Sequence, residues 1–312
     1  MNKNEITVLL SSYNGSTYLE EQIDSILNQE GVIVKLIIRD DGSDNNTKDI
    51  LKKYEILDNI QIYYEKNTGV VGSFLWLIDS APNSDYYALS DQDDVWYNCK
   101  LKRAIDFINL ENNNLPQLYA ANQNHVDADL KFICKHFNSV PKISLMSEMF
   151  RNYISGCTMV FNKEFMGLMR NDKVLRTIAY MRMHDVWMMY LVLIYGNFIY
   201  DHEPVMDFRR HGRNVSDGGI ISGSFISRMA FKIKDILKGS FNKNNISSRS
   251  AEIVLENCRD RLSNKEIYQL DLLVNYRNSI SKKIKLLFCF DLFRNVGIPL
   301  YVAIPKVIFE IY

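Results

Sequence analysis

The sequence predicts an α/β fold in which a mostly parallel sheet is flanked by helices. Two observations lead to this prediction: short apolar runs alternate with segments of helical apolar spacing, and polar or acidic loops follow the apolar runs. The 312 residues are 47% apolar and 24% charged, which suits one large domain with an appendage. Ligands of such sheets bind beyond the carboxyl ends of the strands, so the polar loops are the candidate functional segments.

Four strand and helix units open the chain. Expected strands cover residues 6–10, 32–38, 60–64 and 86–89, and expected helices cover residues 18–27, 46–54, 74–80 and 101–110. Residues 67–72 are expected to form a loop. Further helices are expected at residues 163–169 and 183–194, and further strands at residues 117–121, 156–162, 199–200 and 205–208. The alternation favours parallel strands with helices on both faces.

Charge divides the chain into two parts. Residues 1–224 contain 22 Lys and Arg against 29 Asp and Glu, whereas residues 225–312 contain 15 against 8. We expect a catalytic domain over residues 1–224 and a basic, amphipathic helical region over residues 225–312. The five cysteines are odd in number and widely spaced, and the N-terminus lacks the zones of a signal peptide. Both observations favour a cytoplasmic protein.

The last segment, residues 282–312, is rich in Leu, Ile, Val and Phe but is interrupted by charges and prolines. It lacks the roughly 20 uninterrupted apolar residues of a membrane span. Two interpretations stay open: helices that lie in the headgroup region at the inner face of the cell membrane, or helices packed on the core. A peripheral membrane protein is the favoured expectation.

An acidic loop follows the fourth expected strand. Asp91, Asp93 and Asp94 place three carboxylates within four residues, and their repulsion requires a cation or hydrogen-bond donors. In an extended segment Asp91 and Asp93 face the same way, while Asp94 turns aside. Oxygen ligands of this kind favour Mg²⁺ or Mn²⁺ bridging a diphosphate. A solvated loop with a helix cap is the alternative.

Weaker signals lie in three other segments. Asp41 follows a buried strand and could accept a hydrogen bond from a nucleoside, although acidic Gly turns are common. Tyr13 lies in a polar loop where its ring could stack on a base. Asp185 opens an apolar helix and is either a general base or a residue favoured by the helix dipole. Arg210 and His211 belong to a basic loop that could hold a diphosphate and a metal, or simply face solvent.

Four motifs in this order resemble those of the inverting family-two glycosyltransferases with the GT-A fold: Ser11-Ser12-Tyr13-Asn14-Gly15, Asp40-Asp41-Gly42-Ser43, Asp91-Gln92-Asp93-Asp94-Val95-Trp96 and His184-Asp185. The resemblance covers roughly residues 5–215. The spelling of the acidic motif is similar to that of the rhamnosyltransferase-like branch, which builds bacterial surface polysaccharides such as O-antigen or capsule.

The resemblance assigns roles to individual residues. It implies that Ser11, Tyr13 and Asp41 contact the nucleoside, that Asp91 binds ribose or metal, that Asp93 binds metal, that Asp185 is the base, and that Arg210 and His211 bind diphosphate and metal. It implies a UDP or dTDP sugar donor and a saccharide or lipid-linked acceptor, which residues 122–155 and the C-terminal helices would select. The chain lacks the Q-x-x-R-W motif of processive synthases, so addition of a single sugar is favoured.

Other functions are less favoured by the sequence. A nucleotidylyltransferase would have a Gly-rich, Arg-containing loop after the first strand, and an oxidoreductase would have G-x-G-x-x-G there. No nucleic-acid partner is expected. The remaining alternative is a catalytically inactive scaffold that binds a nucleotide sugar within a polysaccharide assembly complex, although such a scaffold would have no reason to retain both Asp93 and Asp185.

Overall fold

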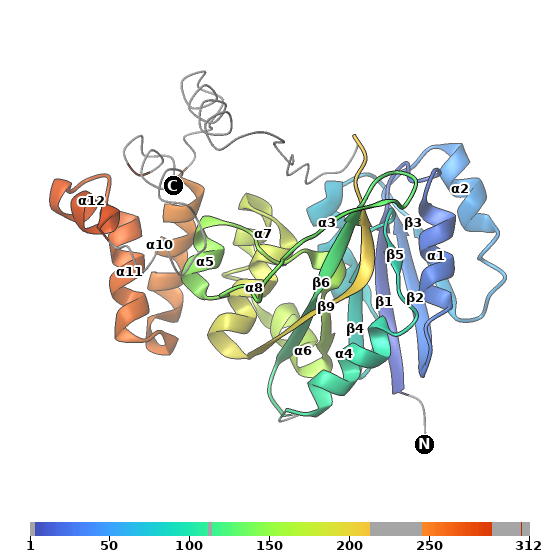
Figure 1. Cartoon of the computed structure of the whole chain (residues 1–312), viewed down its shortest axis with the longest axis horizontal. Helices are drawn as coiled ribbons and strands as arrows, with labels where there is room; N and C mark the ends of the chain where they lie inside the picture. The colour runs from blue at the N-terminus through green and yellow to red at the C-terminus, as the bar shows by residue number, and fades with distance from the viewer. Residues whose placement is uncertain (1–3, 112–113, 213–244, 289–306, 308–312) are drawn as a thin grey trace. The chain divides into compact units, whose positions relative to one another are not determined.

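A computed structural model gives the fold and describes residues 4–111, 114–212, 245–288 and 307 (Figure 1). The chain divides into two units. The first comprises Met1–Val140 and Ile154–Gly212, and the second comprises Pro141–Tyr153 and Arg213–Tyr312. The expected boundary between residues 224 and 225 lies outside the described residues.

The first unit is built on one nine-stranded sheet of the order β3-β2-β1-β4-β8-β6-β9-β5, with β7 paired to β6. The strands are β1 (Asn4–Ser12), β2 (Val32–Asp40), β3 (Ile60–Tyr64), β4 (Tyr86–Ser90), β5 (Val95–Trp96), β6 (Gln117–Val126), β7 (Phe132–Lys135), β8 (Val160–Asn162) and β9 (Asn197–Arg209). The first four strands are parallel, as predicted. The second half is mixed, because β8 and β5 run antiparallel to their neighbours whereas β6 and β9 are parallel.

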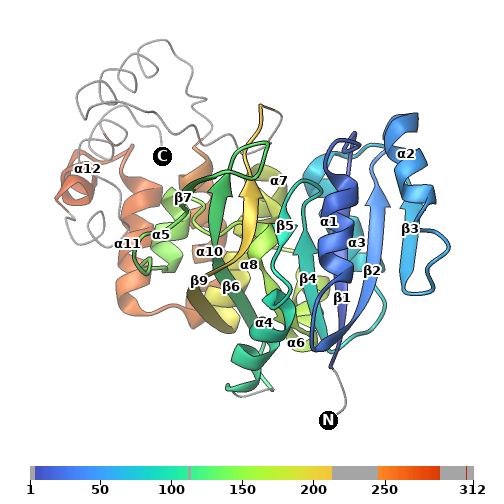
Figure 2. The same ribbon diagram turned by 45° about the vertical axis from the view of Figure 1, so that its right-hand side comes forward.

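Helices cover both faces of this sheet, as predicted (Figure 2). One face carries α1 (Leu19–Leu27), α2 (Asn45–Lys52) and α4 (Lys100–Asn109). The other carries α3 (Gly69–Ser80), α6 (Lys163–Asn171) and α8 (His184–Tyr195). The unit also contains the 3-10 turn η1 (Gly156–Thr158) and the helix α7 (Thr177–Met181).

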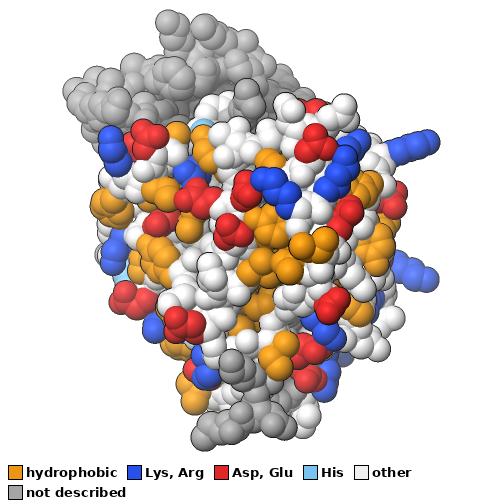
Figure 3. Space-filling view, turned by 90° about the vertical axis from the view of Figure 1, so that its right-hand side faces the viewer, with side chains coloured by type: hydrophobic (Ala, Val, Ile, Leu, Met, Phe, Trp, Pro, Cys, Tyr) orange, Lys and Arg blue, Asp and Glu red, His pale blue; other side chains and the backbone are white. Residues whose placement is uncertain are grey.

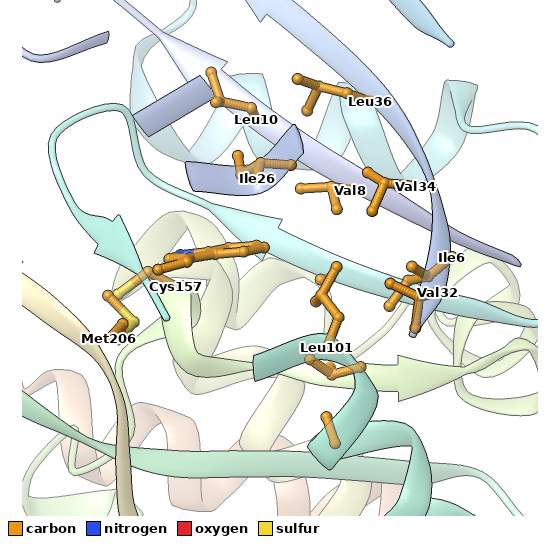
Figure 4. Close-up of a cluster of buried hydrophobic side chains, with 14 of the residues drawn as sticks. Ile6, Val8, Leu10, Ile26, Val32, Val34, Leu36, Leu101, Cys157 and Met206 are labelled. Atoms are coloured by element: carbon orange, nitrogen blue, oxygen red, sulfur yellow. The ribbon is translucent and has the colours of Figure 1, made fainter. Parts of the chain in front are cut away.

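The core beneath α1 and α4 forms because alternate strand residues point to the same face. Ile6, Val8 and Leu10 of β1 lie beside Val34 of β2 and beneath Ile26 of α1 (Figure 4). The three β1 side chains have no exposed surface. Burial of each such side chain contributes about 1.5–3 kcal/mol, so this core holds the strand ends, and the loops that follow them, in fixed positions.

The sheet ends at β3 on one side. Figure 3 shows this end of the molecule, where hydrophobic side chains gather among charged ones. Tyr63 and Tyr64 of β3 and nearby Ile56 and Leu57 are exposed.

Residues 67–72 were expected to form a loop, and the structure corrects this expectation, because α3 already begins at Gly69. Asp41, from the loop after β2, accepts hydrogen bonds from the backbone N–H groups of Thr68 (2.9 Å) and Gly69 (2.9 Å). These are donors that a helix start leaves unsatisfied. The residue that caps α3 is thus distant in sequence, and local patterns could not reveal it.

The second unit contains α5 (Leu145–Phe150), α10 (Ile246–Cys258), η2 (Arg259–Arg261), α11 (Asn264–Asn275) and α12 (Ile280–Leu287). Helices were expected over residues 225–312, and the described part of this region, residues 245–288, consists mainly of helices. Residues 213–244 and most of residues 289–312 lie outside the described part. No helix among the described residues is long and apolar enough to cross a membrane.

Candidate active site

The loop after β1 is fastened to the acidic loop after β4 by one side chain. The Oε1 atom of Gln92 accepts hydrogen bonds from the Tyr13 backbone N–H (2.8 Å) and from the Ser12 hydroxyl (3.2 Å). The Nε2 atom of Gln92 donates to the Tyr13 carbonyl (3.0 Å). Gly15 leaves room for this side chain, because a Cβ there would lie 2.2 Å from Oε1 of Gln92 and would displace it. Gln92 therefore fixes the loop that carries Tyr13.

The loop after β1 is also joined to the loop after β2. The backbone N–H of Asn14 donates to the Ser43 hydroxyl (2.9 Å), and the Asn14 side chain accepts from the backbone N–H of Asp44 (2.9 Å). Asn14 has a φ of 49°, a left-handed conformation that Asn tolerates better than most residues. The three loops that were predicted to bind the donor are thus held together by direct hydrogen bonds.

The predicted nucleoside residues differ in how accessible they are. The Tyr13 side chain is 49% exposed, so its ring is free to stack on a flat ligand. The Ser11 hydroxyl is half-buried and lies 2.6 Å from the hydroxyl of Ser73, a residue of α3.

Asp41 is buried and forms an ion pair with Arg39. The Asp41 carboxylate also accepts hydrogen bonds from the backbone of Thr68 and Gly69, so partners within the chain already occupy it. Any contact of Asp41 with a nucleoside must share these partners, so its nucleoside role stays a prediction.

Asp91 lies at the end of β4 among other acidic groups. Its carboxylate, that of Asp94 and the Cys157 thiol have ligand atoms within 4.8 Å of one another. Burial raises the pKa of Asp91 to about 7, and the nearby charges of Asp93 and Asp185 add to this effect. Asp185 is therefore near enough to Asp91 for their charges to interact.

Asp93 points toward the end of β9. Its Oδ2 atom lies 2.8 Å from Nε2 of His211, which comes from the basic loop after β9. Arg209 fixes this approach, since its Nε donates to the Asp93 carbonyl (3.1 Å) while its other nitrogens bind Glu21 and the Ala128 carbonyl. The structure therefore brings together two of the predicted metal ligands from opposite ends of the domain.

Arg210 precedes His211 in this loop. Its backbone N–H donates to the Val126 carbonyl (2.9 Å), and its side chain is half-buried. Arg210 thus stands next to the Asp93 and His211 pair, and its predicted role as a diphosphate ligand stays a prediction. Arg213, the third arginine of the loop, lies outside the described residues.

Asp185 opens α8 and is 6% exposed. Its Oδ1 accepts a hydrogen bond from the Val186 backbone N–H (2.8 Å). The preceding residue, His184, stacks on Phe74 of α3 with ring centroids 4.1 Å apart. Gly156 packs against both, because a Cβ there would lie 2.9 Å from Nε2 of His184 and 3.5 Å from Cβ of Asp185. This packing holds the start of α8, which carries Asp185.

Sequence reasoning missed several contributors to the site. Lys100, Cys157 and Arg39 are buried polar residues beneath the loops, and Gly156 leaves room for His184. Only Arg39 had a local signal, since it ends an apolar run directly before the acidic turn. The other three depend on packing between distant segments.

The fold is shared with solved structures. Staphylococcus aureus TarS 1-349 matches with a TM-score of 0.57 at 14% identity, covering 98% of this chain and 89% of that one. The same protein in complex with UDP-GlcNAc matches with a TM-score of 0.56 at 13% identity, with the same coverage. The sheet and its flanking helices have the GT-A glycosyltransferase fold, as predicted.

Sequence comparisons define the family. Residues 7–166 match the family model described as glycosyl transferase family 2. A dTDP-rhamnosyl transferase of Shigella flexneri, RfbG, is 30% identical over 221 residues, which are 66% of this chain and 72% of that protein. TuaG of Bacillus subtilis, a glycosyltransferase assigned to teichuronic acid biosynthesis, is 33% identical over 105 residues, 33% of this chain and 41% of TuaG. The chain belongs to glycosyl transferase family 2, and the predicted resemblance is confirmed.

Proposed function

We propose that the protein is an inverting, metal-dependent glycosyltransferase that transfers a single sugar from a nucleoside diphosphate to a hydroxyl acceptor in bacterial surface polysaccharide synthesis. One observation carries this proposal. Asp93 contacts His211, and burial and the charges of Asp93 and Asp185 raise the pKa of Asp91. This combination supports a single site for the candidate metal ligands and the candidate base at the carboxyl ends of the strands.

The donor is a UDP or dTDP sugar in this proposal, with rhamnose as the first sugar to test. The similar RfbG is named a dTDP-rhamnosyl transferase, and TarS has been solved with UDP-GlcNAc. We assign Tyr13, which is exposed, together with Ser11 and Asp41 to the nucleoside end of the proposed site. Arg210 is the cation beside the Asp93 and His211 pair that would bind the diphosphate.

The acidic residues fit a divalent cation. Asp91, Asp93 and His211 offer two carboxylates and an imidazole, a donor set that suits Mg²⁺ or Mn²⁺. The cation, when bound, supplies positive charge that stabilises the departing diphosphate. The approach of Asp93 Oδ2 to within 2.8 Å of Nε2 of His211 supports a shared role of these two residues in holding the cation.

Asp185 is proposed as the general base. It accepts the proton of the acceptor hydroxyl while that oxygen bonds to the anomeric carbon and the diphosphate leaves from the opposite side. One displacement of this kind inverts the anomeric configuration. The hydrogen bond from the Val186 N–H and the packing of His184 against Phe74 hold the start of α8, and the charge of Asp185 acts on Asp91.

The acceptor is a saccharide or a lipid-linked saccharide, and the protein is proposed to work at the inner face of the cell membrane. On α12 the side chains of Ile280 and Ile284, and of Phe288 just after it, are exposed at spacings of four residues. Lys283 and Lys285 accompany them. Such a helix suits the headgroup region of anionic lipid. We therefore propose that residues 1–224 form the domain that transfers the sugar and that residues 225–312 contact the membrane.

Release of nucleotide tests the proposed reaction. The purified protein, Mn²⁺ and each of a panel of UDP and dTDP sugars are incubated with octyl glycosides as hydroxyl acceptors, and NMR identifies the anomer of the product. We expect nucleotide release and an inverted product with one donor, lost in Asp93→Ala and in Asp185→Asn. Tight donor binding without release from any donor would favour the inactive scaffold instead.

A further inference from the structure

Tyr18, the residue before α1, lies beside the candidate metal ligand His211. The centroids of the two rings are 5.0 Å apart, and their planes are inclined by 33°. The guanidinium of Arg209 lies over the same tyrosine ring, with its Cζ atom 4.4 Å from the ring centroid. Arg209 ends β9 and His211 follows it by two residues, so one aromatic ring contacts both side chains at the start of the basic loop.

The backbone of Tyr18 is fixed by the loop that carries Tyr13. The N–H groups of Tyr18 (3.1 Å) and of Leu19 (3.0 Å) both donate to the carbonyl of Gly15. Gln92 holds the same loop through its hydrogen bonds to the backbone of Tyr13. Tyr18 therefore connects the loop that is proposed to bind the nucleoside with a residue that is proposed to bind the metal.

Arg209 is held by three other segments of the first unit. Its side chain is buried, and its nitrogens donate to the carbonyl oxygens of Asp93 (3.1 Å) and Ala128 (2.6 Å). Arg209 also forms an ion pair with Glu21 of α1. A guanidinium that has lost part of its hydration attracts the face of an aromatic ring more strongly than an exposed one. Arg209 therefore holds the ring of Tyr18 firmly in place.

We propose that Tyr18 is a positioning residue of the metal site: its ring, held by the Arg209 guanidinium, keeps the His211 imidazole against Asp93. This inference rests on the proposed function only in taking His211 and Asp93 as metal ligands. In the arrangement that the ring maintains, Oδ2 of Asp93 lies 2.8 Å from Nε2 of His211. Residues that orient a metal ligand contribute about tenfold to a hundredfold to the affinity for the metal.

Titration calorimetry with Mn²⁺ in the presence of UDP tests this role. Tyr18→Leu removes the ring, and its dissociation constant for Mn²⁺ is expected to be about tenfold above that of the unmodified protein. Its dissociation constant for UDP without metal is expected to change by less than about threefold, because Tyr18 acts on His211. Tyr18→Phe is the matched control, since it keeps the ring, and its Mn²⁺ affinity is expected to stay within about threefold of the unmodified protein.

Three results would overturn the proposal. The first is an unchanged Mn²⁺ affinity in Tyr18→Leu. The second is an equal loss of affinity in Tyr18→Phe, because the ring would then not be what holds His211. The third is a loss of UDP binding without metal that equals the loss of Mn²⁺ binding, because the substitution would then damage the whole loop. If Tyr18→Leu does not fold, Tyr18→Met takes its place with the same expectations.

A second measurement needs no metal and separates failure of this inference from failure of the proposed function. If the unmodified protein binds no Mn²⁺, the metal role of His211 is wrong, and the hold of Tyr18 on His211 is decided by the rate at which diethyl pyrocarbonate acylates His211, followed by mass spectrometry. Tyr18→Leu frees the imidazole and is expected to react at least about threefold faster, whereas Tyr18→Phe should react like the unmodified protein. His202 in β9 is the internal control, with the same rate expected in all three proteins. Equal rates at His211 in all three proteins would contradict the proposal.

Discussion

Asp93 and His211 are separated by 118 positions in the sequence, yet Oδ2 of Asp93 lies 2.8 Å from Nε2 of His211. The sheet explains this contact. Val95 pairs with Asp207 and Trp96 with Met206, so β5 carries the end of the acidic loop alongside β9. The short strand β5 therefore brings the acidic loop after β4 next to the basic loop after β9. These two loops carry the candidate metal ligands.

The first prediction concerns this pair. His211→Ala removes one imidazole ligand and is expected to weaken Mn²⁺ binding about tenfold to a hundredfold, measured by titration calorimetry with UDP present. His202→Ala, from the same strand β9, is the control and is expected to leave the affinity unchanged. Equal affinities for the unmodified protein and His211→Ala would remove His211 from the metal site.

The second prediction concerns the base. Asp185→Asn keeps the shape of the side chain but cannot accept a proton, so kcat is expected to fall by about a hundredfold or more. The KM for the donor should change by less than about threefold, because Asp185 acts on the acceptor. Steady-state kinetics separate the two constants. Unchanged kcat would show that another group accepts the proton.

The third prediction uses two glycines. Gly156→Ala puts a methyl group 2.9 Å from Nε2 of His184, so the His184 ring must shift, and the neighbouring Asp185 is expected to follow. Shifts of this size are expected to lower kcat by about tenfold to a hundredfold. Gly167→Ala in α6 meets no atom within 4 Å and is expected to stabilise the helix by about 0.5–1 kcal/mol. Full activity in Gly156→Ala would contradict the packing argument.

The fourth prediction is a pH dependence. The pKa of Asp91 is raised to about 7 by burial and by Asp93 and Asp185. Below that pH the carboxyl holds a proton that a metal must displace, so Mn²⁺ affinity is expected to fall about tenfold per pH unit below 7 and to level off above it. Calorimetry in buffers of different ionisation enthalpy should detect the released proton at pH 6. Equal affinity at pH 6 and pH 8 would contradict the assignment.

The same raised pKa has a consequence for folding without metal. Between the unfolded pKa of Asp, about 3.9, and the folded value of about 7, the folded state holds a proton that the unfolded state releases. The free energy of unfolding should therefore decrease as the pH rises through this window. The part of the decrease due to Asp91 is measured as the difference from Asp91→Asn.

Much of the first unit could be predicted from periodicity. β3 begins and ends where the apolar run does, and the loops that follow β1, β2 and β4 were recognised because polar residues interrupt apolar runs there. The antiparallel strand β5 could not be predicted, because two residues are too few to show an alternating apolar pattern. The start of α3 was missed because its cap, Asp41, comes from another loop.

Residues in acidic or basic clusters could be proposed for the candidate site from the sequence, whereas single buried residues near it could not. Lys100 follows Cys99 at the start of an ordinary amphipathic helix, where a lysine suggests solvent. Only the approach of Cys157 and Trp96 shows that it is buried. Gln92 was part of a recognised motif, yet its bonds to Tyr13 depend on the distance between two strands.

The account is tested most directly by thermal unfolding with UDP and dTDP sugars, each with and without Mn²⁺, because a ligand that binds only the folded state raises the Tm. We predict a shift with one donor that requires Mn²⁺ and disappears in Asp93→Ala. Equal shifts with and without Mn²⁺, or no shift with any donor, would contradict a metal-dependent transferase.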